Sequence, residues 1–373
     1  MNIIKESAPH LRRKANVSRM MIDVLIALAP TLIFSFIVYP INTLIFYVIS
    51  LFIMIGSEFV FVGLKNMMPK DGMKHPFKER FAYAYKGKIT INNFLAPAIS
   101  AVIFVLIMPA GAPIYAVIVG ALVGIVIGKL VFGGLGSNIF NPAVVGMLFA
   151  KVCFGSQYVN VIPTWYYTVP DAVAGATPLG MIANGAFSNI SQYQLLDMFL
   201  GRVPGTLGEV YKITILVGMA YLLIRRSADF RIVVSYLGTF IFLSLIAGLS
   251  IFMLDKEINP FMFMLYNLLS GGVLFAAAFM LTDPVTSPIN SPSRIIYGMV
   301  AAVMTIFIRF FAALPEGVGF SILIANMVAV FLDHYEWSNP RYTWKNILAM
   351  SLIVLLSGTT VLLVIRFGGV YHG

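Results

Sequence analysis

Runs of about 20 apolar residues recur along the whole chain, and this is the length that an α-helix needs to cross the hydrocarbon core of a bilayer. The strands of an outer-membrane barrel would instead alternate over short segments. The runs therefore predict an all-α polytopic membrane protein with about 11 transmembrane helices. We expect the spans at residues 20–39, 43–63, 93–111, 114–132, 139–155, 208–224, 232–254, 261–281, 295–313, 317–333 and 346–366.

The composition agrees with this class. Hydrophobic residues make up 60% of the chain and charged residues 11%, whereas a typical soluble domain has about 25% charged residues. A soluble enzyme and a disordered chain are therefore excluded. The single cysteine, Cys153, excludes an internal disulfide and an iron–sulfur cluster made by this chain alone. No metal site is predicted, because neither His10 nor His334 has a second ligand at a suitable spacing.

The positions of the basic residues predict the orientation. The formal net charge is +10, and most of the 25 Lys and Arg residues fall in the N-terminal tail and in the loops after spans two, six, eight and ten. Cytoplasmic loops of membrane proteins collect Lys and Arg. The charge therefore indicates lipid rather than nucleic acid as the partner. It predicts a multi-pass membrane protein with a cytoplasmic N-terminus.

This topology divides the chain into five parts. They are a basic cytoplasmic tail (1–19), a first membrane part (20–155, with a cytoplasmic loop at 64–92), an extracytoplasmic loop (156–207), a second membrane part (208–333), and a cytoplasmic loop with an extra C-terminal helix (334–373). A loop as long as 156–207 is typical of a functional segment. Its apolar stretch at Leu195–Leu200 predicts a short interfacial helix.

The two membrane parts resemble each other in sequence. Asn93-Phe94-Leu95 matches Asn267-Leu268-Leu269, and Ile114-Tyr115-Ala116-Val117 matches Ile296-Tyr297-Gly298-Met299. An odd number of spans separates the equivalent segments, so the two copies should lie upside down relative to each other. We therefore expect a ten-helix core of two inverted five-helix repeats, an architecture that places its functional site near the midplane.

Acidic residues in or near the spans are candidates for function, because ionisable groups in a bilayer are costly. Glu58 lies late in span two, and Asp283 lies at the cytoplasmic end of span eight. Both are candidates for an ion pathway or for contact with a partner subunit. The alternative is a helix-end acid that backbone groups or a lysine satisfy. Asp23 is interpreted as a charge near the N-terminus of span one.

Asn138 and Asn141, with the proline that follows, break the start of span five. A broken helix frees backbone groups and can line a cavity, so both asparagines are pocket candidates. The long side chains of Lys129, Lys151 and Arg309 are expected to extend to the membrane interfaces.

The outer loop contains the motif Asp171-Ala172-Val173-Ala174-Gly175-Ala176-Thr177-Pro178-Leu179. Gly175 and Ala176 give a small, open backbone beside the hydroxyl of Thr177. This arrangement suits enzymatic modification of Thr177 or the close approach of a phosphate. An ordinary turn is the alternative.

The motif resembles the flavinylation sequence Asp-x-x-Ser/Thr-Gly-Ala-Thr of respiratory membrane subunits. Further segments are similar to the same family, namely Pro9–Arg13 with Met20–Pro30, Gly133–Ala143, and Leu269–Gly272 with Phe279–Pro288. The family is the RnfD/NqrB family of membrane flavin-binding redox subunits, and the resemblance covers residues 8–335. It implies an FMN joined to Thr177 through a phosphoester, with Asp171, Gly175 and Ala176 around it. Ala174 stands where the family has Ser or Thr, which weakens the expected recognition by the flavin transferase.

The resemblance also implies a function. Within the family, the RnfD branch fits better than the NqrB branch, because NqrB is longer before its Pro-His segment and only eight residues precede Pro9. The expected complex is an ion-translocating ferredoxin:NAD+ oxidoreductase coupled to Na+ or H+. In it, this chain would relay electrons through FMN. The expected partners are the other Rnf subunits (RnfA, RnfB, RnfC, RnfE and RnfG), with RnfG as the flavin neighbour, and a flavin transferase.

The chain alone is expected to be inactive, because it has neither a Rossmann glycine fingerprint after a strand nor cluster cysteines. The pocket near Asn138 and Asn141 is left open to a second flavin (riboflavin), a quinone or lipid. One alternative function is that of NqrB in a Na+-translocating NADH:quinone reductase. The other, from a different class, is a channel-like solute permease, which needs no flavinylation motif.

Overall fold

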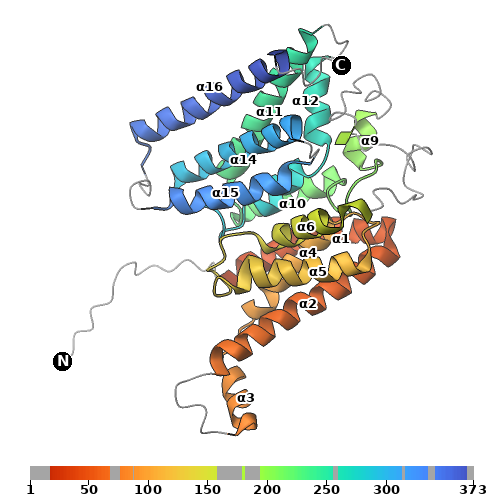
Figure 1. Ribbon diagram of the computed structural model, residues 1–373, viewed down its shortest axis with the longest axis vertical. Helices are drawn as coiled ribbons and strands as arrows, with labels where there is room; N and C mark the ends of the chain where they lie inside the picture. The colour runs from red at the N-terminus through yellow and green to blue at the C-terminus, as the bar shows by residue number, and fades with distance from the viewer. Residues whose placement is uncertain are drawn as a thin grey trace, which may run out of the picture.

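The computed structural model describes residues 17–67, 76–86, 88–157, 179–180, 194–254, 259–312, 316–334 and 341–367. Within these ranges the chain forms helices and connecting loops, with one isolated β-bridge between Pro109 and Thr206. Figure 1 shows the helices of the first membrane part beside those of the second, and α16 (Trp344–Phe367) at the outer edge. The predicted class, an all-α polytopic membrane protein, is confirmed.

The first membrane part places helices along its predicted spans. They are α1 (Val17–Val38), α2 (Pro40–Met67), α4 (Asn92–Ile107), α5 (Ile114–Ile125) with the π-helix η2 (Val126–Leu130), and α6 (Pro142–Phe154) with the 3-10 turn η3 (Gly155–Gln157). A short helix, α3 (Phe77–Tyr85), lies in the loop after α2. Small residues bring α5 and α6 close together, since a Cβ added at Gly124 would lie 3.0 Å from the Cα of Gly146.

The second membrane part is built in the same way. Its helices are α10 (Lys212–Arg225), α11 (Phe230–Phe252), α12 (Pro260–Leu269), α13 (Val273–Phe275) with the π-helix η5 (Ala276–Met280), α14 (Ser291–Phe311) and α15 (Val318–Leu332). The short helix predicted in the outer loop is confirmed as α9 (Leu195–Leu200), which packs against α10 and α12.

Among the described helices, α1, α2, α11, α14 and α16 are long and apolar enough to cross a membrane by themselves. The pair α12 and α13–η5, bent by 61° at its junction, is long and apolar enough for a sixth crossing if both helices belong to one span. The span predicted at 261–281 therefore coincides with two helices and contains a break that was not predicted. The break has a local cause: Gly271 has φ +62, a left-handed conformation that glycine adopts without steric cost.

The same pairs of helices pack in both halves, as an internal repeat predicts. In the first half α4 packs on α1 and α2, while α5 packs on α2 and α6. In the second half α13–η5 packs on α10, α12 on α11, and α14 on α11 and α15. Across the halves α1 contacts α10, and α6 contacts α15. Equivalent helices therefore meet at the boundary between the halves, whereas the inverted orientation of the two copies stays a prediction.

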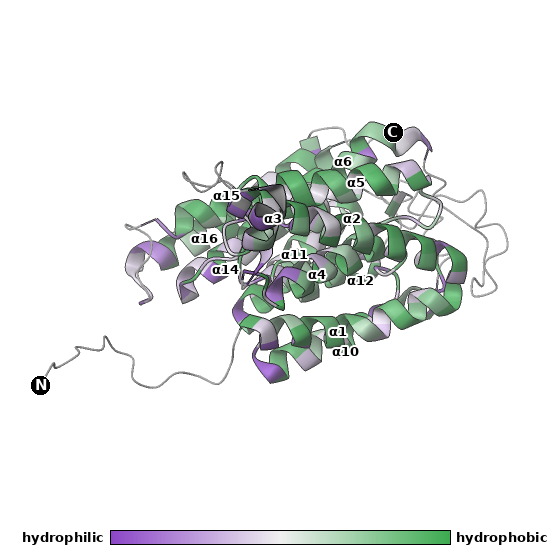
Figure 2. Ribbon diagram, turned by 90° about the horizontal axis from the view of Figure 1, so that it is seen from below, coloured by the Kyte–Doolittle hydropathy of each residue, from purple (hydrophilic) through white to green (hydrophobic). Residues whose placement is uncertain are grey.

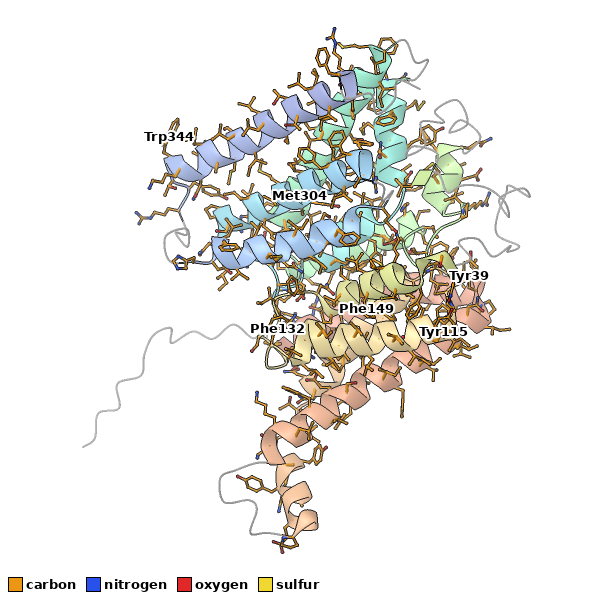
Figure 3. All side chains as sticks on the ribbon, in the orientation of Figure 1. Tyr39, Tyr115, Phe132, Phe149, Met304 and Trp344 are labelled. Atoms are coloured by element: carbon orange, nitrogen blue, oxygen red, sulfur yellow. The ribbon has the colours of Figure 1, made fainter. Side chains whose placement is uncertain are left out.

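The outer surface of the helices is apolar, as a bilayer requires. Figure 2 shows hydrophobic colour along most of each long helix and hydrophilic colour mainly at the ends, and Figure 3 shows the side chains that project outward. Phe52 and Ile224, for example, are each 81% exposed. Among the described helices, the extra helix α16 packs mainly on α11 and α14, at the outside of the repeat core. Polar side chains with a functional role are therefore expected between the two halves.

Candidate functional site

The first cavity, which we call the inner cavity, lies between the two halves at the end that is predicted to face the cytoplasm. It has a volume of about 270 Å³. Side chains from α1, α4, η2 and the loops after η2, α10 and η5 form its walls. Its polar lining consists of Ser100, Lys129, Asn138, Asn141, Ser227, Thr282 and Asp283. Three of the four predicted membrane site residues therefore converge on one cavity.

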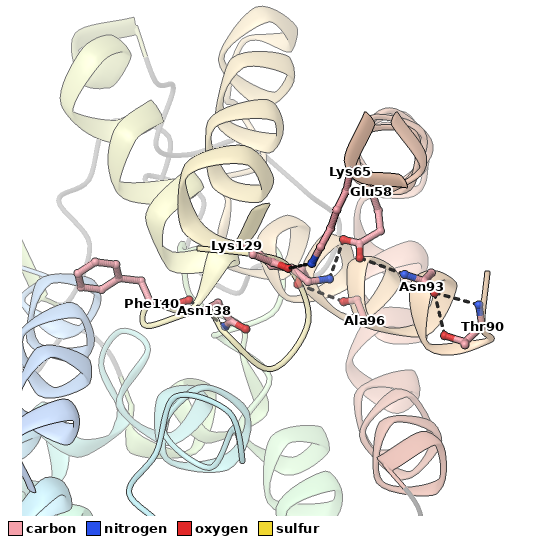
Figure 4. Close-up of polar contacts among 10 residues, drawn as sticks. Glu58, Lys65, Thr90, Asn93, Ala96, Lys129, Asn138 and Phe140 are labelled. Carbon is pink, nitrogen blue, oxygen red and sulfur yellow. Dashed lines mark hydrogen bonds and ion pairs between the residues drawn. The ribbon is translucent and has the colours of Figure 1, made fainter. Parts of the chain in front are cut away.

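The fourth, Glu58, lies directly behind Lys129. The Lys129 Nζ is 2.9 Å from Glu58 Oε2, and the two side chains are 3% and 2% exposed. The Asn93 amide donates to Glu58 Oε1 at 3.4 Å, as Figure 4 shows. The prediction that Lys129 reaches the interface was wrong, because a buried carboxylate on α2 supplies its counter-charge instead. Removing one partner of such a buried pair typically costs about 3–5 kcal/mol.

The two asparagines stabilise the loop between η2 and α6, which forms part of the cavity wall. Asn141 Oδ1 accepts a hydrogen bond from the backbone N–H of Ala143 at 3.1 Å, so Asn141 is the N-cap of α6. Asn138 donates to the carbonyl of Phe140 at 3.2 Å. The break predicted at the start of span five is confirmed, and both side chains lie on the cavity wall.

Asp283 follows the π-helix η5, and its side chain folds back onto its own loop. Its carboxylate accepts from the backbone N–H of Val285 at 3.1 Å and from the Thr286 hydroxyl at 3.4 Å. Backbone groups therefore satisfy the acid, as the structural alternative predicted, while its place in the cavity wall leaves the ion pathway a prediction.

Asp23 joins the two halves beside the inner cavity. Its carboxylate accepts from Arg225 at 3.1 Å, from the Ser227 hydroxyl at 2.7 Å and from the Tyr221 hydroxyl at 3.2 Å. The interpretation of Asp23 as a charge at a helix N-terminus was wrong, because it lies in the second turn of α1 and its partners come from α10 and the loop after it.

The second cavity, which we call the outer cavity, has a volume of about 300 Å³ and lies at the opposite end of the boundary between the halves. The charged residues in its wall are Lys151, Glu209, Lys212 and Glu316. The sequence-based reasoning considered neither glutamate. A charged residue directly before or at the start of an apolar helix, as at Glu209, Lys212 and Glu316, is the signal that could have found them.

The predicted flavinylation residues Asp171, Gly175, Ala176 and Thr177 lie outside the described residues. Leu179, two positions after Thr177, is buried and lines the outer cavity. Its Cδ2 lies 3.2 Å from the position that a Cβ on Gly271 would take. The end of the motif is therefore anchored at this cavity.

Buried cations satisfy the backbone at the broken helix. The Lys212 ammonium donates to the carbonyls of Glu209 at 2.5 Å and Gly271 at 2.8 Å. Arg309, which is 2% exposed, donates to the carbonyls of Asn267 at 2.8 Å and Ser270 at 3.4 Å. The predicted extension of Arg309 to the interface was therefore wrong. Carbonyls at a helix C-terminus lack helical partners and favour positive charge, and the break supplies them inside the protein.

The two outer glutamates share a proton. Their carboxyl groups are in hydrogen-bond contact, which requires a proton on one of them. Burial raises the pKa of Glu209 well above its usual range, and the neighbouring Glu316 carboxyl raises it further. Burial acts on Glu316 too, but the Lys151 ammonium, 3.0 Å away, and the hydrogen bond from Glu209 bring its pKa below the ordinary value. The two directions, upward for Glu209 and downward for Glu316, favour the proton on Glu209.

The fold and the two cavities define a polytopic helical membrane protein whose functional groups lie between two related halves. Among the described residues, no three His, Cys, Asp or Glu side chains gather as a metal site would need. The model of the NQR2, RnfD, RnfE family matches residues 4–341, and the chain belongs to this family. The resemblance drawn from the motifs is confirmed.

Individual relatives come from two kinds of complex. The D subunit of the Na(+)-translocating ferredoxin:NAD(+) oxidoreductase complex of Acetobacterium woodii is 29% identical over 337 residues, which cover 90% of this chain and 94% of the relative. The B subunit of the Na(+)-translocating NADH-quinone reductase of Chromohalobacter salexigens is 38% identical over 241 residues, covering 64% and 57%. The equivalent chain of Ectopseudomonas mendocina is 36% identical, covering 64% and 58%. The chain thus spans less than two thirds of the length of these quinone-reductase relatives.

Proposed function

We propose that this chain is the RnfD membrane subunit of an Rnf-type ferredoxin:NAD+ oxidoreductase that uses electron transfer to move Na+ or H+ across the cytoplasmic membrane. The observation that carries the proposal is the end-to-end match to the Acetobacterium woodii relative, over 90% of this chain and 94% of that one. The match to the quinone-reductase relatives is higher in identity but covers only 57–58% of their length. The NqrB function therefore remains the second candidate.

The cofactor of the proposed relay is an FMN joined to Thr177 through a phosphoester. The outer cavity fits such a group. Leu179 anchors the motif at the cavity wall, and Lys151, Lys212 and the nearby Arg309 outnumber the one ionised glutamate. Excess positive charge favours a phosphate diester, so Lys151 and Lys212 are the residues that would hold it. Bound FMN would supply the redox chemistry, while this chain supplies position and electrostatics.

The inner cavity is proposed to serve the ion. Glu58 and Asp283 are the carboxylates of the pathway, and Asn138 and Asn141 shape the pocket beside them. A mainly apolar cavity with a few convergent polar groups is also typical of small-molecule sites. A second flavin (riboflavin) is therefore proposed as an occupant of this cavity, with a quinone as the alternative.

The complex requires other subunits. This chain has one cysteine, Cys153, which is exposed, so cluster chemistry must come from partners. The proposed partners are the other Rnf subunits (RnfA, RnfB, RnfC, RnfE and RnfG), with RnfG as the flavin neighbour, and a flavin transferase that acts on the outer side. The orientation rests on the basic residues of the loops, which favour a cytoplasmic N-terminus.

Covalent flavin is the first test. The chain is co-expressed with a flavin transferase as wild type, Thr177→Ala and Thr168→Ala, a threonine in the same loop, and flavin fluorescence is measured in a denaturing gel. We expect a fluorescent band in the wild type and in Thr168→Ala, and none in Thr177→Ala. No wild-type band, with the transferase active on another target, would contradict the relay and favour the permease.

A further inference from the structure

Lys129 stands between Glu58 and the inner cavity. Its side chain lines the cavity, whereas Glu58 does not. The ammonium is 2.9 Å from the Glu58 carboxylate, and both groups are almost completely buried. Figure 4 shows Lys129 and Glu58 facing each other between α2 and η2. The Lys129 ammonium therefore lies between Glu58 and a cation in the cavity.

Glu58 depends on this ammonium. Among the described residues, the other hydrogen bond to Glu58 comes from the amide of Asn93, at 3.4 Å. The Thr90 backbone N–H and hydroxyl donate to Asn93 Oδ1 at 2.9 Å and 2.8 Å, which fixes the amide with its nitrogen toward Glu58. A buried carboxylate with one long amide contact is poorly satisfied. If Lys129 leaves, a different cation has to take its place.

A second carboxylate lies in the wall of the cavity that Lys129 lines. Asp283 lines the same cavity, its charge attracts Lys129, and among the described residues it makes no ion pair. The π-helix η2, in which Lys129 lies, passes directly into a loop where Gly133 and Gly134 have positive φ. Single π-helical turns occur frequently at functional sites. Two carboxylates thus compete for one ammonium.

We propose that Lys129 is a gate, a tethered ammonium that occupies the place of the transported cation at Glu58 and turns to Asp283 when that cation enters. When Glu58 and Asp283 are both ionised, Lys129 neutralises only one of them, so this group of three residues carries a net negative charge in the resting state. One monovalent cation restores neutrality, because Glu58 then holds the ion and Asp283 holds Lys129. Lys129 is a positioning residue here, and the inference rests on the proposed function in ion translocation.

The test uses the whole complex in membrane vesicles, prepared with Lys129→Gln, Lys129→Arg, or Lys65→Gln as the control. Lys65 is exposed and donates to the carbonyl of Gly133 in the same region. Ferredoxin-dependent NAD+ reduction is measured as Na+ is raised from a sodium-depleted buffer. This separates the half-saturating Na+ concentration from the maximal turnover, and flavin content and subunit assembly verify each preparation.

Lys129→Gln removes the competing charge, so we expect the half-saturating Na+ concentration to fall by about tenfold or more. Maximal turnover should fall as well, because nothing displaces the bound ion. Lys129→Arg should shift half-saturation upward, since a guanidinium binds a carboxylate through two hydrogen bonds and is harder to displace. If Lys129→Gln fails to assemble, the half-saturating Na+ concentration of Lys129→Arg tests the gate by itself. Lys65→Gln should match the wild type.

Two results would overturn the inference in different ways. If the wild type responds to Na+ and both Lys129 variants keep its half-saturation while turnover drops, the Glu58–Lys129 pair is structural and only the gate is wrong. If wild-type turnover does not respond to Na+, the proposed coupling to Na+ fails together with the gate.

Discussion

The Lys212 ammonium donates a hydrogen bond to the carbonyl oxygen of Gly271 at 2.8 Å. The first residue of α10 therefore satisfies a backbone carbonyl at the break between α12 and α13. The left-handed Gly271 turns the chain, and the turn leaves carbonyls without helical partners. In a bilayer such groups need a partner inside the protein. The position of a cation at the start of one helix therefore permits the bend in another.

Removal of this cation should destabilise the second half. Lys212→Met keeps the length of the side chain but leaves the Glu209 and Gly271 carbonyls without their donor. An unsatisfied buried polar group costs about 1–3 kcal/mol. We expect a lower thermal midpoint of the purified protein in detergent, with Lys65→Met as an exposed control. An unchanged midpoint would show that other groups satisfy the break.

The Gly271 conformation gives a second prediction. Alanine at this position would have to adopt the left-handed region, at a cost of about 1–2 kcal/mol. Its Cβ would also lie 3.2 Å from Arg309 Nη2 and from Leu179 Cδ2. Gly271→Ala should therefore lower the thermal midpoint. Gly238→Ala is the matched control, because Gly238 lies within α11 with nothing within 4 Å of an added Cβ, and it should leave stability unchanged or raise it.

The shared proton makes stability depend on pH. Since the pKa of Glu209 is raised in the folded protein, the contribution of this group is fully present below the ordinary glutamate value of 4.5 and is lost as pH rises through the folded pKa. The change is at most about 1.4 kcal/mol per pH unit for one proton. Glu209→Gln imitates the protonated acid, so this part of the decline of the thermal midpoint above pH 4.5 should disappear.

Glu316→Gln is the comparison for that experiment. It removes the partner of Lys151 at 3.0 Å, so it should lower the midpoint at neutral pH, where Glu209→Gln does not. Equal effects of the two substitutions would contradict the assignment of the proton to Glu209.

The flavinylation motif gives a fourth prediction. Ala174 stands at the Ser/Thr position of the flavinylation sequence that the motif resembles. Ala174→Ser should raise the yield of covalent flavin when the flavin transferase is limiting, measured as gel fluorescence per mass of protein. Ala172→Ser, in the same segment, is the control. Equal yields in all three proteins would show that the transferase does not read position 174.

The sequence was sufficient to predict the helices, because each crossing needs its own apolar run and every predicted span coincides with a helix or a helix pair. It was also sufficient to place Asn138 and Asn141 at a break and Asp283 at the end of a helix, since Gly, Pro and Asn are local signals. The bend at Gly271 was missed because two glycines inside an apolar run do not disturb its hydropathy.

The buried cations could not be predicted in the same way. Lys129 pairs with Glu58, 71 residues earlier, and Arg309 binds the backbone of Asn267, 42 residues earlier. A lysine or arginine near a helix end is compatible both with the membrane surface and with a buried partner, and only the packing of distant helices decides between them. The same reason hid Glu209 and Glu316, because they are more than 100 positions apart in the sequence and the partner of Glu316, Lys151, comes from the other half.

Each half of the molecule keeps a counter-charge for the other. Asp23 of α1 is neutralised by Arg225 of α10, and Lys151 of α6 by Glu316 ahead of α15. When the first five helices are made, both groups still lack their partners: Asp23 gains Arg225 with the first helix of the second half, whereas Lys151 gains Glu316 only just before its last helix. Neither copy of the repeat is therefore electrically complete by itself.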